Sequence, residues 1–224
     1  MTRSDELATA LRRIRAEIPS TCTLIVVTKT FPVSDAEILY HLCERDFGEN
    51  REDEGAAKSA ALPDDARWHY QGEIQSKKIK SLVSWADYIH SLDDLSHATK
   101  INRAATELNK QVKAFIQINL DTSRQNSNRG GIAPESLDQF ITGLEALNGG
   151  GLSICGVMGV APLNEDPAPA FAQLQEISFR LRKKWPHAAL ISAGMSSDYK
   201  VALKYGATHL RLGSSILGHR ATAI

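Results

Sequence analysis

Short apolar runs alternate with longer amphipathic stretches along nearly the whole chain. The runs have the length and the β-branched and aromatic content of strands, whereas the stretches between them repeat apolar residues at the period of a helix. The runs predict eight strands, at 23–29, 45–49, 68–72, 88–92, 112–120, 152–159, 188–192 and 208–213. The stretches predict an amphipathic helix at the start of the chain and helices that include 34–45, 51–60, 95–110 and 169–185.

This order of elements predicts an α/β fold. Several strands are continuous apolar runs, as expected for parallel strands that are covered on both faces. Eight strand–helix repeats without a strand-only segment favour a closed barrel over the alternative, a doubly wound open sheet. No Gly-Ser-rich or Pro-rich linker divides the chain. We therefore predict a single (β/α)8 TIM-type barrel with an extra N-terminal helix, forming one domain over residues 1–224.

Composition narrows the classes of partner. The 26 Lys and Arg residues balance the 26 Asp and Glu residues, so we expect no electrostatic surface for nucleic acid or an anionic membrane. No apolar run reaches the roughly 18 residues of a membrane helix, and the amphipathic start does not read as a signal peptide. The three cysteines lack metal-type spacing, which fits a reducing compartment. We expect a cytoplasmic protein without a metal site.

Function in such barrels resides at the carboxyl ends of the strands. Lys29 ends the first apolar run, where desolvation can lower the pKa of its amine and make it a nucleophile. Alternatively, its stem lies along apolar neighbours and its ammonium reaches water. Asn50 and His69 follow or end neighbouring strands and could orient a planar ligand or hold loop backbone. The long polar stretch 121–131 follows the fifth strand, which places it among the strand–helix loops where a barrel carries function.

The segments after the seventh and eighth strands indicate a phosphate site, which many barrels build from these two loops. Gly194 supplies flexible backbone, and Ser196 can cap the helix that follows it. Gly213 and Ser214 can offer N–H and hydroxyl donors. Ordinary glycine turns with a capping serine are the alternative. Arg211 precedes this loop and can only donate hydrogen bonds, either to the ligand or in an ion pair at the barrel mouth.

Six stretches together resemble the YggS/PROSC family of pyridoxal phosphate homeostasis proteins. They occur in the order and at the spacing of that family, and the resemblance runs from the first helix to Arg220. The stretches are VVTKTFP around Lys29, FGENREDE at 47–54, WHYQGEIQSKK at 68–78, GVMGVAP at 156–162, SAGMSSDY at 192–199 and RLGSSILGHR at 211–220.

The resemblance implies a barrel like the amino-terminal domain of bacterial alanine racemase, with pyridoxal 5′-phosphate held as a Schiff base on Lys29. It also implies that Arg211 faces the pyridine nitrogen of the cofactor. The family's phosphate contacts correspond to Ser196, Gly213 and Ser214, with Met195 in the same loop. The family's pocket-lining positions correspond to Asn50, His69 and Met158.

The chain departs from the family pattern at five positions. Phe31 replaces a second lysine close to the Schiff-base lysine, and Ala193 replaces a methionine. Glu73, Lys77 and Arg129 replace a histidine, an asparagine and a lysine, respectively. None of these removes the Schiff-base lysine or the phosphate loop, but Phe31, Glu73 and Lys77 alter the pocket rim.

The chemistry of Arg211 predicts little turnover. An arginine only donates, so the pyridine nitrogen it contacts must accept and is unprotonated, which makes the ring a poorer electron sink. Racemases that resemble this chain compensate with two bases, one of them a tyrosine on a carboxyl-terminal β domain, whereas ten residues follow Ser214 here. The prediction is a monomeric cofactor carrier in vitamin B6 homeostasis that buffers pyridoxal phosphate or delivers it to apo-enzymes.

Three alternatives remain open. The first is a weak amino-acid racemase or another pyridoxal phosphate enzyme. The second is a Schiff-base aldolase in which Lys29 attacks a sugar-phosphate carbonyl. The third is an interaction module whose partners do not depend on Lys29.

Overall fold

The computed structural model describes residues 2–121, 130–147 and 149–218. Arg129 and most of the polar stretch 121–131 lie outside the described residues. Within the described ranges, no helix is both long and apolar enough to cross a membrane.

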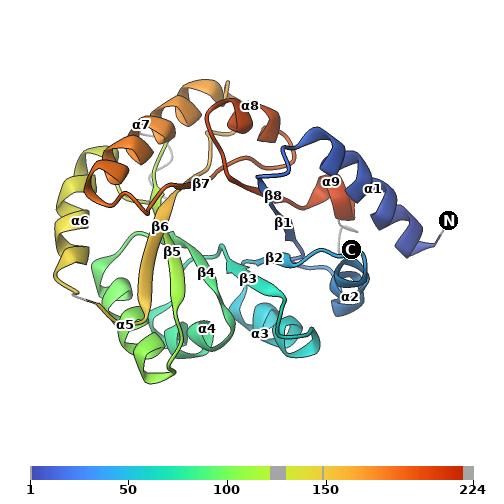
Figure 1. Cartoon of the computed structure of the whole chain (residues 1–224), viewed down its shortest axis with the longest axis horizontal. Coiled ribbons are helices and arrows are strands. Elements are labelled where there is room, and N and C mark those ends of the chain that lie inside the picture. Colours follow the sequence, from blue (N-terminus) through green and yellow to red (C-terminus); the bar gives the residue numbers. More distant parts are fainter. Residues whose placement is uncertain (1, 122–129, 148, 219–224) are drawn as a thin grey trace.

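Eight parallel strands close into a barrel in which each strand pairs with the next and β8 pairs with β1 (Figure 1). The barrel prediction is confirmed, and the open-sheet alternative is wrong. The predicted strand boundaries agree with the observed ones to within two residues. The strands are β1 (Thr23–Val27), β2 (Asp46–Glu49), β3 (Arg67–Tyr70), β4 (Tyr88–Leu92), β5 (Val112–Ile118), β6 (Leu152–Gly159), β7 (Leu190–Ser192) and β8 (His209–Leu212).

Helices follow the strands and form a ring outside the barrel (Figure 1). The predicted N-terminal helix is α1 (Arg3–Glu17), and it begins with a capping box in which Thr2 and Asp5 exchange hydrogen bonds. The other helices are α2 (Val33–His41), α3 (Glu52–Ala61), α4 (Ile79–Trp85), α5 (Leu95–Glu107), α6 (Leu137–Glu145), α7 (Ala168–Lys184), α8 (Tyr199–Lys204) and α9 (Ser214–Leu217). Short 3-10 turns at Ser76–Lys78 and Pro134–Ser136 precede α4 and α6.

The strands are buried on both faces, but the two faces differ in chemistry. In β8, Leu210 and Leu212 belong to the main apolar core. His209 and Arg211, at the alternate positions, reach side chains of other strands across the barrel interior. The interior therefore carries buried polar and charged groups, which must find partners inside the barrel.

Candidate functional site

A pocket of about 540 Å³ lies at the carboxyl ends of β1 and β8 and beside the loop after β7. Its volume is in the range of small-molecule sites, roughly 300–1,000 Å³. Six of the nine residues predicted to form the site line it, namely Lys29, Met195, Ser196, Arg211, Gly213 and Ser214. Phe31, one of the departures from the family pattern, also lines it. The structure thus brings together residues from three separate segments.

The turn that carries Lys29 is bonded to a buried ion pair between Lys58 and Glu49. β1 ends at Val27, so Lys29 lies in the β1–α2 turn, half-buried. The preceding residue, Thr28, donates its hydroxyl hydrogen to Glu49 Oε1 at 2.6 Å. Lys58 Nζ donates both to the Thr28 carbonyl oxygen at 2.8 Å and to Glu49 Oε1 at 2.6 Å. These bonds fix the backbone immediately before Lys29.

Glu49 and Lys58 were not among the residues predicted from the sequence. Their side chains are 0% and 4% exposed. Burial raises the pKa of Glu49, an effect that the hydrogen bonds from Lys58 and Thr28 oppose without cancelling. Glu49 lies within the family-like stretch 47–54, which is the one signal that pointed to it. A lysine on a helix is usually exposed, so nothing in the local sequence marked Lys58 as a buried partner.

The side chain of Arg211 is anchored inside the barrel and lines the pocket. It is 5% exposed, and burial lowers its pKa to about 10, so it remains a cation at neutral pH. Nη1 donates to Ser192 Oγ at 2.6 Å, and Nη2 donates to the Gly159 carbonyl oxygen at 3.0 Å. Both acceptors are uncharged, which argues against the mouth ion pair. A guanidinium has five N–H donors, so others are available for a ligand.

Two short loops, after β7 and after β8, line the pocket together with Lys29. Ser196 Oγ donates to Ser215 Oγ at 3.1 Å and accepts from the Ser215 amide at 3.2 Å, which joins the loop after β7 to the start of α9. A Cβ atom on Gly213 would lie 3.2 Å from the Val27 carbonyl oxygen, so the eighth-strand loop passes close to the first strand. Gly194 has φ +92°, which confirms the need for flexible backbone there.

The predicted capping role of Ser196 is wrong. α8 begins at Tyr199, and its N-cap residue is Asp198. The Asp198 carboxylate accepts the Met195 amide hydrogen at 2.6 Å and so closes the turn before the helix. Because Asp198 occupies the capping position, Ser196 is left to bridge the two loops.

The other three predicted residues do not line the pocket. Asn50 Oδ1 is buried without a hydrogen-bond partner among the described residues. His69 is fully buried, and Asp46 and His90 contact its two ring nitrogens. Met158 packs with Phe115 and Cys155 in a small apolar cluster.

Gln71 lines the pocket and was not predicted. It follows β3, and its Nε2 is buried without a hydrogen-bond partner within the described part of the chain. A buried amide nitrogen of this kind is expected to complete its hydrogen bonds with a ligand or water. Together, the pocket offers an amine, a guanidinium, an amide and serine hydroxyls, a set suited to an anionic ligand that carries a carbonyl group.

Comparison with known proteins identifies relatives that this chain matches over nearly its whole length. The family model described as alanine racemase, N-terminal domain, matches residues 3–221. The pyridoxal phosphate homeostasis protein of Mycobacterium bovis is 34% identical over 248 residues, covering 97% of this chain and 94% of the relative. The protein of the same name from Synechocystis is 36% identical over 213 residues, covering 92% and 95%.

Solved structures agree with this assignment. PipY of Synechococcus elongatus, without PLP, has a TM-score of 0.87 and 33% identity, covering 95% of this chain and all of PipY. PipY with PLP bound has a TM-score of 0.85 and 32% identity over the same shares. An alanine racemase of Clostridium difficile, 16% identical with a TM-score of 0.79, shares the fold over 98% of this chain and 57% of its own. The chain therefore belongs to the YggS/PROSC family of pyridoxal phosphate homeostasis proteins, within the alanine racemase N-terminal domain family.

Proposed function

We propose that this chain binds pyridoxal 5′-phosphate in the pocket at the ends of β1 and β8 and serves in vitamin B6 homeostasis. The observation that carries the proposal is the convergence of Lys29, Arg211 and the serine-bearing loops on one pocket. The relatives that bear the name pyridoxal phosphate homeostasis protein, and PipY with PLP bound, support the same ligand.

Lys29 is the proposed point of covalent attachment. Its amine would add to the aldehyde carbon of the cofactor, with a C=N bond in place of the C=O bond and the carbonyl oxygen released as water. Lys29 is the lysine among the pocket-lining residues, and the bonds from Lys58 to Thr28 hold its turn in place. Because this addition is reversible, the same amine allows both loading and release.

The remaining groups of the pocket orient the ligand. Ser196 and Ser214 offer hydroxyl groups to the phosphate, and Gly213 brings its loop close without a side chain. Arg211 would donate to the pyridine nitrogen, which would then accept and carry no proton. When bound, the cofactor supplies an aldehyde and an electron-withdrawing ring, and an unprotonated ring withdraws electrons less strongly.

We therefore propose a carrier or buffer with little or no turnover, acting as a cytoplasmic monomer that passes its cofactor to apo-enzymes. The alternative of a weak racemase predicts that amino acids exchange their Cα hydrogen. The aldolase alternative predicts covalent trapping only when a sugar phosphate is present.

Incubation of the cofactor-loaded protein with L-alanine is expected to give little D-alanine, well below the enzyme range of roughly 1–10³ s⁻¹. The reason is that an unprotonated pyridine ring, held by Arg211, withdraws electrons from Cα only weakly. Chiral chromatography and deuterium exchange at Cα measure the racemisation, with an alanine racemase as the positive control.

The transfer of cofactor is a second measurement. An apo-enzyme incubated with the loaded protein should regain activity faster than free cofactor release allows. Turnover within the enzyme range would establish the racemase alternative, and slower reactivation would leave buffering alone.

Removal of both pocket serine hydroxyls, by Ser196→Ala together with Ser214→Ala, is expected to weaken cofactor binding. Each hydrogen bond to a charged phosphate contributes about 1.5–3 kcal/mol, or roughly one to two decades of affinity per site. Fluorescence titration of the apo-protein measures the dissociation constant.

Ser215→Ala is the matched control for this change. It removes the hydroxyl that accepts from Ser196 without altering a pocket-lining side chain. The control should retain near-wild-type affinity. Unchanged affinity in a folded double variant would show that the phosphate binds elsewhere.

A further inference from the structure

A line of hydrogen bonds crosses the barrel interior from the pocket toward the amino-terminal ends of the strands. Arg211 Nη1 lies 2.6 Å from Ser192 Oγ, and Ser192 Oγ lies 2.8 Å from His90 Nδ1. His90 Nε2 lies 2.9 Å from His69 Nδ1, and His69 Nε2 lies 3.0 Å from Asp46 Oδ1. Five side chains from β8, β7, β4, β3 and β2 thus form one continuous chain, which we call the interior relay.

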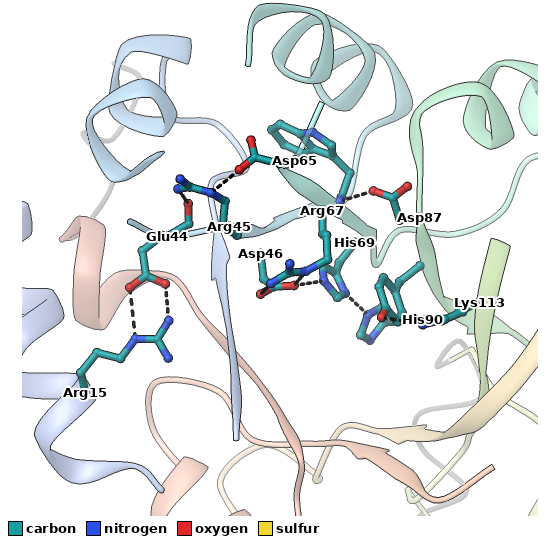
Figure 2. A network of polar contacts seen from close by, with 12 residues as sticks. Arg15, Glu44, Arg45, Asp46, Asp65, Arg67, His69, Asp87, His90 and Lys113 are labelled. Carbon is teal, nitrogen blue, oxygen red and sulfur yellow. Dashed lines mark hydrogen bonds and ion pairs between the residues drawn. The ribbon is translucent and has the colours of Figure 1, made fainter. Parts of the chain in front are cut away.

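The interior relay ends at the carboxylate of Asp46, which also forms an ion pair with Arg67. Figure 2 shows Asp46 between Arg67 and His69, with His90 beyond His69. Arg67 donates to both Asp46 oxygens, at 2.8 Å from Nε and 2.5 Å from Nη2. Burial alone would raise the pKa of Asp46, but the hydrogen bonds from His69 and Arg67 hold it below its usual range. Asp46 is therefore ionised and can only accept.

The two imidazoles in the middle are neutral. Both are fully buried, and burial lowers the pKa of each ring. Geometry allows at most one imidazolium in the pair, because an N–H···N bond between His69 and His90 requires one nitrogen without a hydrogen. The neighbouring rings are Tyr88, stacked on His69 at 4.4 Å, and Phe115, stacked on His90 at 4.4 Å.

Other titratable groups face the same space. His209 lies 6.3 Å from His69 between ring centroids, and burial lowers its pKa to about 3, so it is neutral as well. Asp87 and Lys113 lie nearer the amino-terminal ends of the strands (Figure 2), where Lys113 Nζ donates to the Tyr88 hydroxyl at 3.3 Å. Within the described chain, Asp46 is the carboxylate in contact with an imidazole of the relay.

These constraints fix the position of every proton in the relay. An ionised Asp46 accepts from His69 Nε2–H, so His69 Nδ1 is bare and accepts from His90 Nε2–H. His90 Nδ1 is then bare and accepts from the Ser192 hydroxyl, whose oxygen accepts from Arg211. The same order follows from Arg211 at the other end of the relay, because a guanidinium can only donate. All four bonds point in one direction, and bonds aligned in this way polarise and strengthen one another.

We propose that Ser192, His90, His69 and Asp46 are positioning residues of the cofactor site, which hold the Arg211 guanidinium against the pyridine nitrogen and keep that nitrogen unprotonated. This inference rests on the proposed function for the identity of the ligand. In the interior relay, the Ser192 hydroxyl oxygen accepts from Arg211. The relay then connects the buried Arg211 cation to the buried Asp46 carboxylate. Without it, the guanidinium would keep the Gly159 carbonyl as its anchor and lose a fixed orientation.

Nitrogen-15 NMR of histidines in the full-length wild-type protein tests the direction of the relay without any cofactor. Both His69 and His90 should carry hydrogen on Nε2 and a bare Nδ1 at neutral pH. An Nδ1–H tautomer or an imidazolium at either position would overturn the proposal. This measurement stands even if the protein binds no pyridoxal phosphate, an outcome that would contradict the proposed function and not the proton order.

Ser192→Ala and His90→Phe test the effect on the cofactor. Each should leave Lys29 able to attach pyridoxal phosphate but weaken its binding, roughly tenfold for one lost hydrogen bond of ordinary strength. Each should also shift the nitrogen-15 resonance of a ring-labelled cofactor toward the protonated value. Ser192→Thr, which keeps the hydroxyl, should restore both readouts. Phe115→Leu is the packing control, because it alters the ring stacked on His90 without touching a relay bond.

The pyridine nitrogen resonance separates positioning from mere support of the fold. A variant that only loosened the barrel would lower stability and affinity but leave the resonance of the bound fraction unchanged. Wild-type resonances in folded Ser192→Ala and His90→Phe would therefore overturn the proposal. If His90→Phe does not fold, His90→Gln provides the same comparison, because its side chain cannot join Ser192 and His69 in the same geometry.

Discussion

Replacement of Lys29 by alanine is expected to abolish covalent attachment of pyridoxal phosphate. The Schiff base requires an amine at the pocket wall, and Lys29 is the amine that the described pocket places there. Incubation with cofactor, reduction with borohydride and peptide mass spectrometry measure the attachment. The wild-type protein should carry the reduced cofactor on the peptide that contains Lys29, and the variant should carry none at stoichiometric yield. Noncovalent binding through the phosphate loops should persist.

Lys80→Ala is the matched control, because it removes an exposed lysine of α4 that does not line the pocket. It should retain the full yield of reduced cofactor. Lys29→Arg keeps a cation at the site but no primary amine, so it should behave as the alanine variant does. Attachment to another lysine in the native wild-type protein would reject Lys29 as the site.

Replacement of Lys58 by methionine is expected to lower the free energy of unfolding by about 3–5 kcal/mol, the usual effect of removing one partner of a buried ion pair. Methionine leaves the Glu49 carboxylate buried without its cation, and it also removes the donor to the Thr28 carbonyl oxygen. Urea unfolding followed by circular dichroism measures the change. Cofactor binding should weaken too, since Thr28 precedes Lys29 in the turn.

The pH dependence gives an additional check on Lys58→Met. In the wild-type protein the pKa of Glu49 is already raised by burial, so its contribution to stability is present at low pH and decreases as the pH rises through the folded-state pKa. Without Lys58 the folded state favours the protonated carboxyl even more. The difference between variant and wild type should therefore shrink as the pH is lowered.

Two controls define the ion-pair effect. Adding Glu49→Gln to Lys58→Met removes the unpaired charge and should recover a large part of the lost stability. Arg103→Met breaks an exposed pair with Glu107 and should change stability by no more than about 1 kcal/mol. A loss of unfolding free energy for Lys58→Met as small as that for the exposed pair would contradict a stabilising role for the bonds from Lys58 to Thr28 and Glu49.

The repeated strand–helix order and the closed barrel could be predicted from the sequence alone, and so could six residues that the structure brings to one pocket. These features are local. The period of apolar residues reports secondary structure and burial, and the carboxyl end of a strand in a parallel barrel is always at the same face. Lys29, Arg211 and Ser196 could therefore be placed near one another before their distances were known.

The partners of the buried polar groups became known from the folded chain alone. His69 was predicted at the pocket, yet it is fully buried between Asp46 and His90 and does not line the pocket. Strand alternation predicts the face on which a residue lies but not which polar group lies across the barrel. His90 and Ser192 are 102 positions apart and meet only when the barrel closes. The burial of Lys58 could not be predicted for the same reason. The helix pattern around Lys58 does not show that Glu49 of β2 contacts that position. Burial makes an unpaired polar group costly, so these long-range pairings, which the local sequence does not encode, select the arrangement of the site.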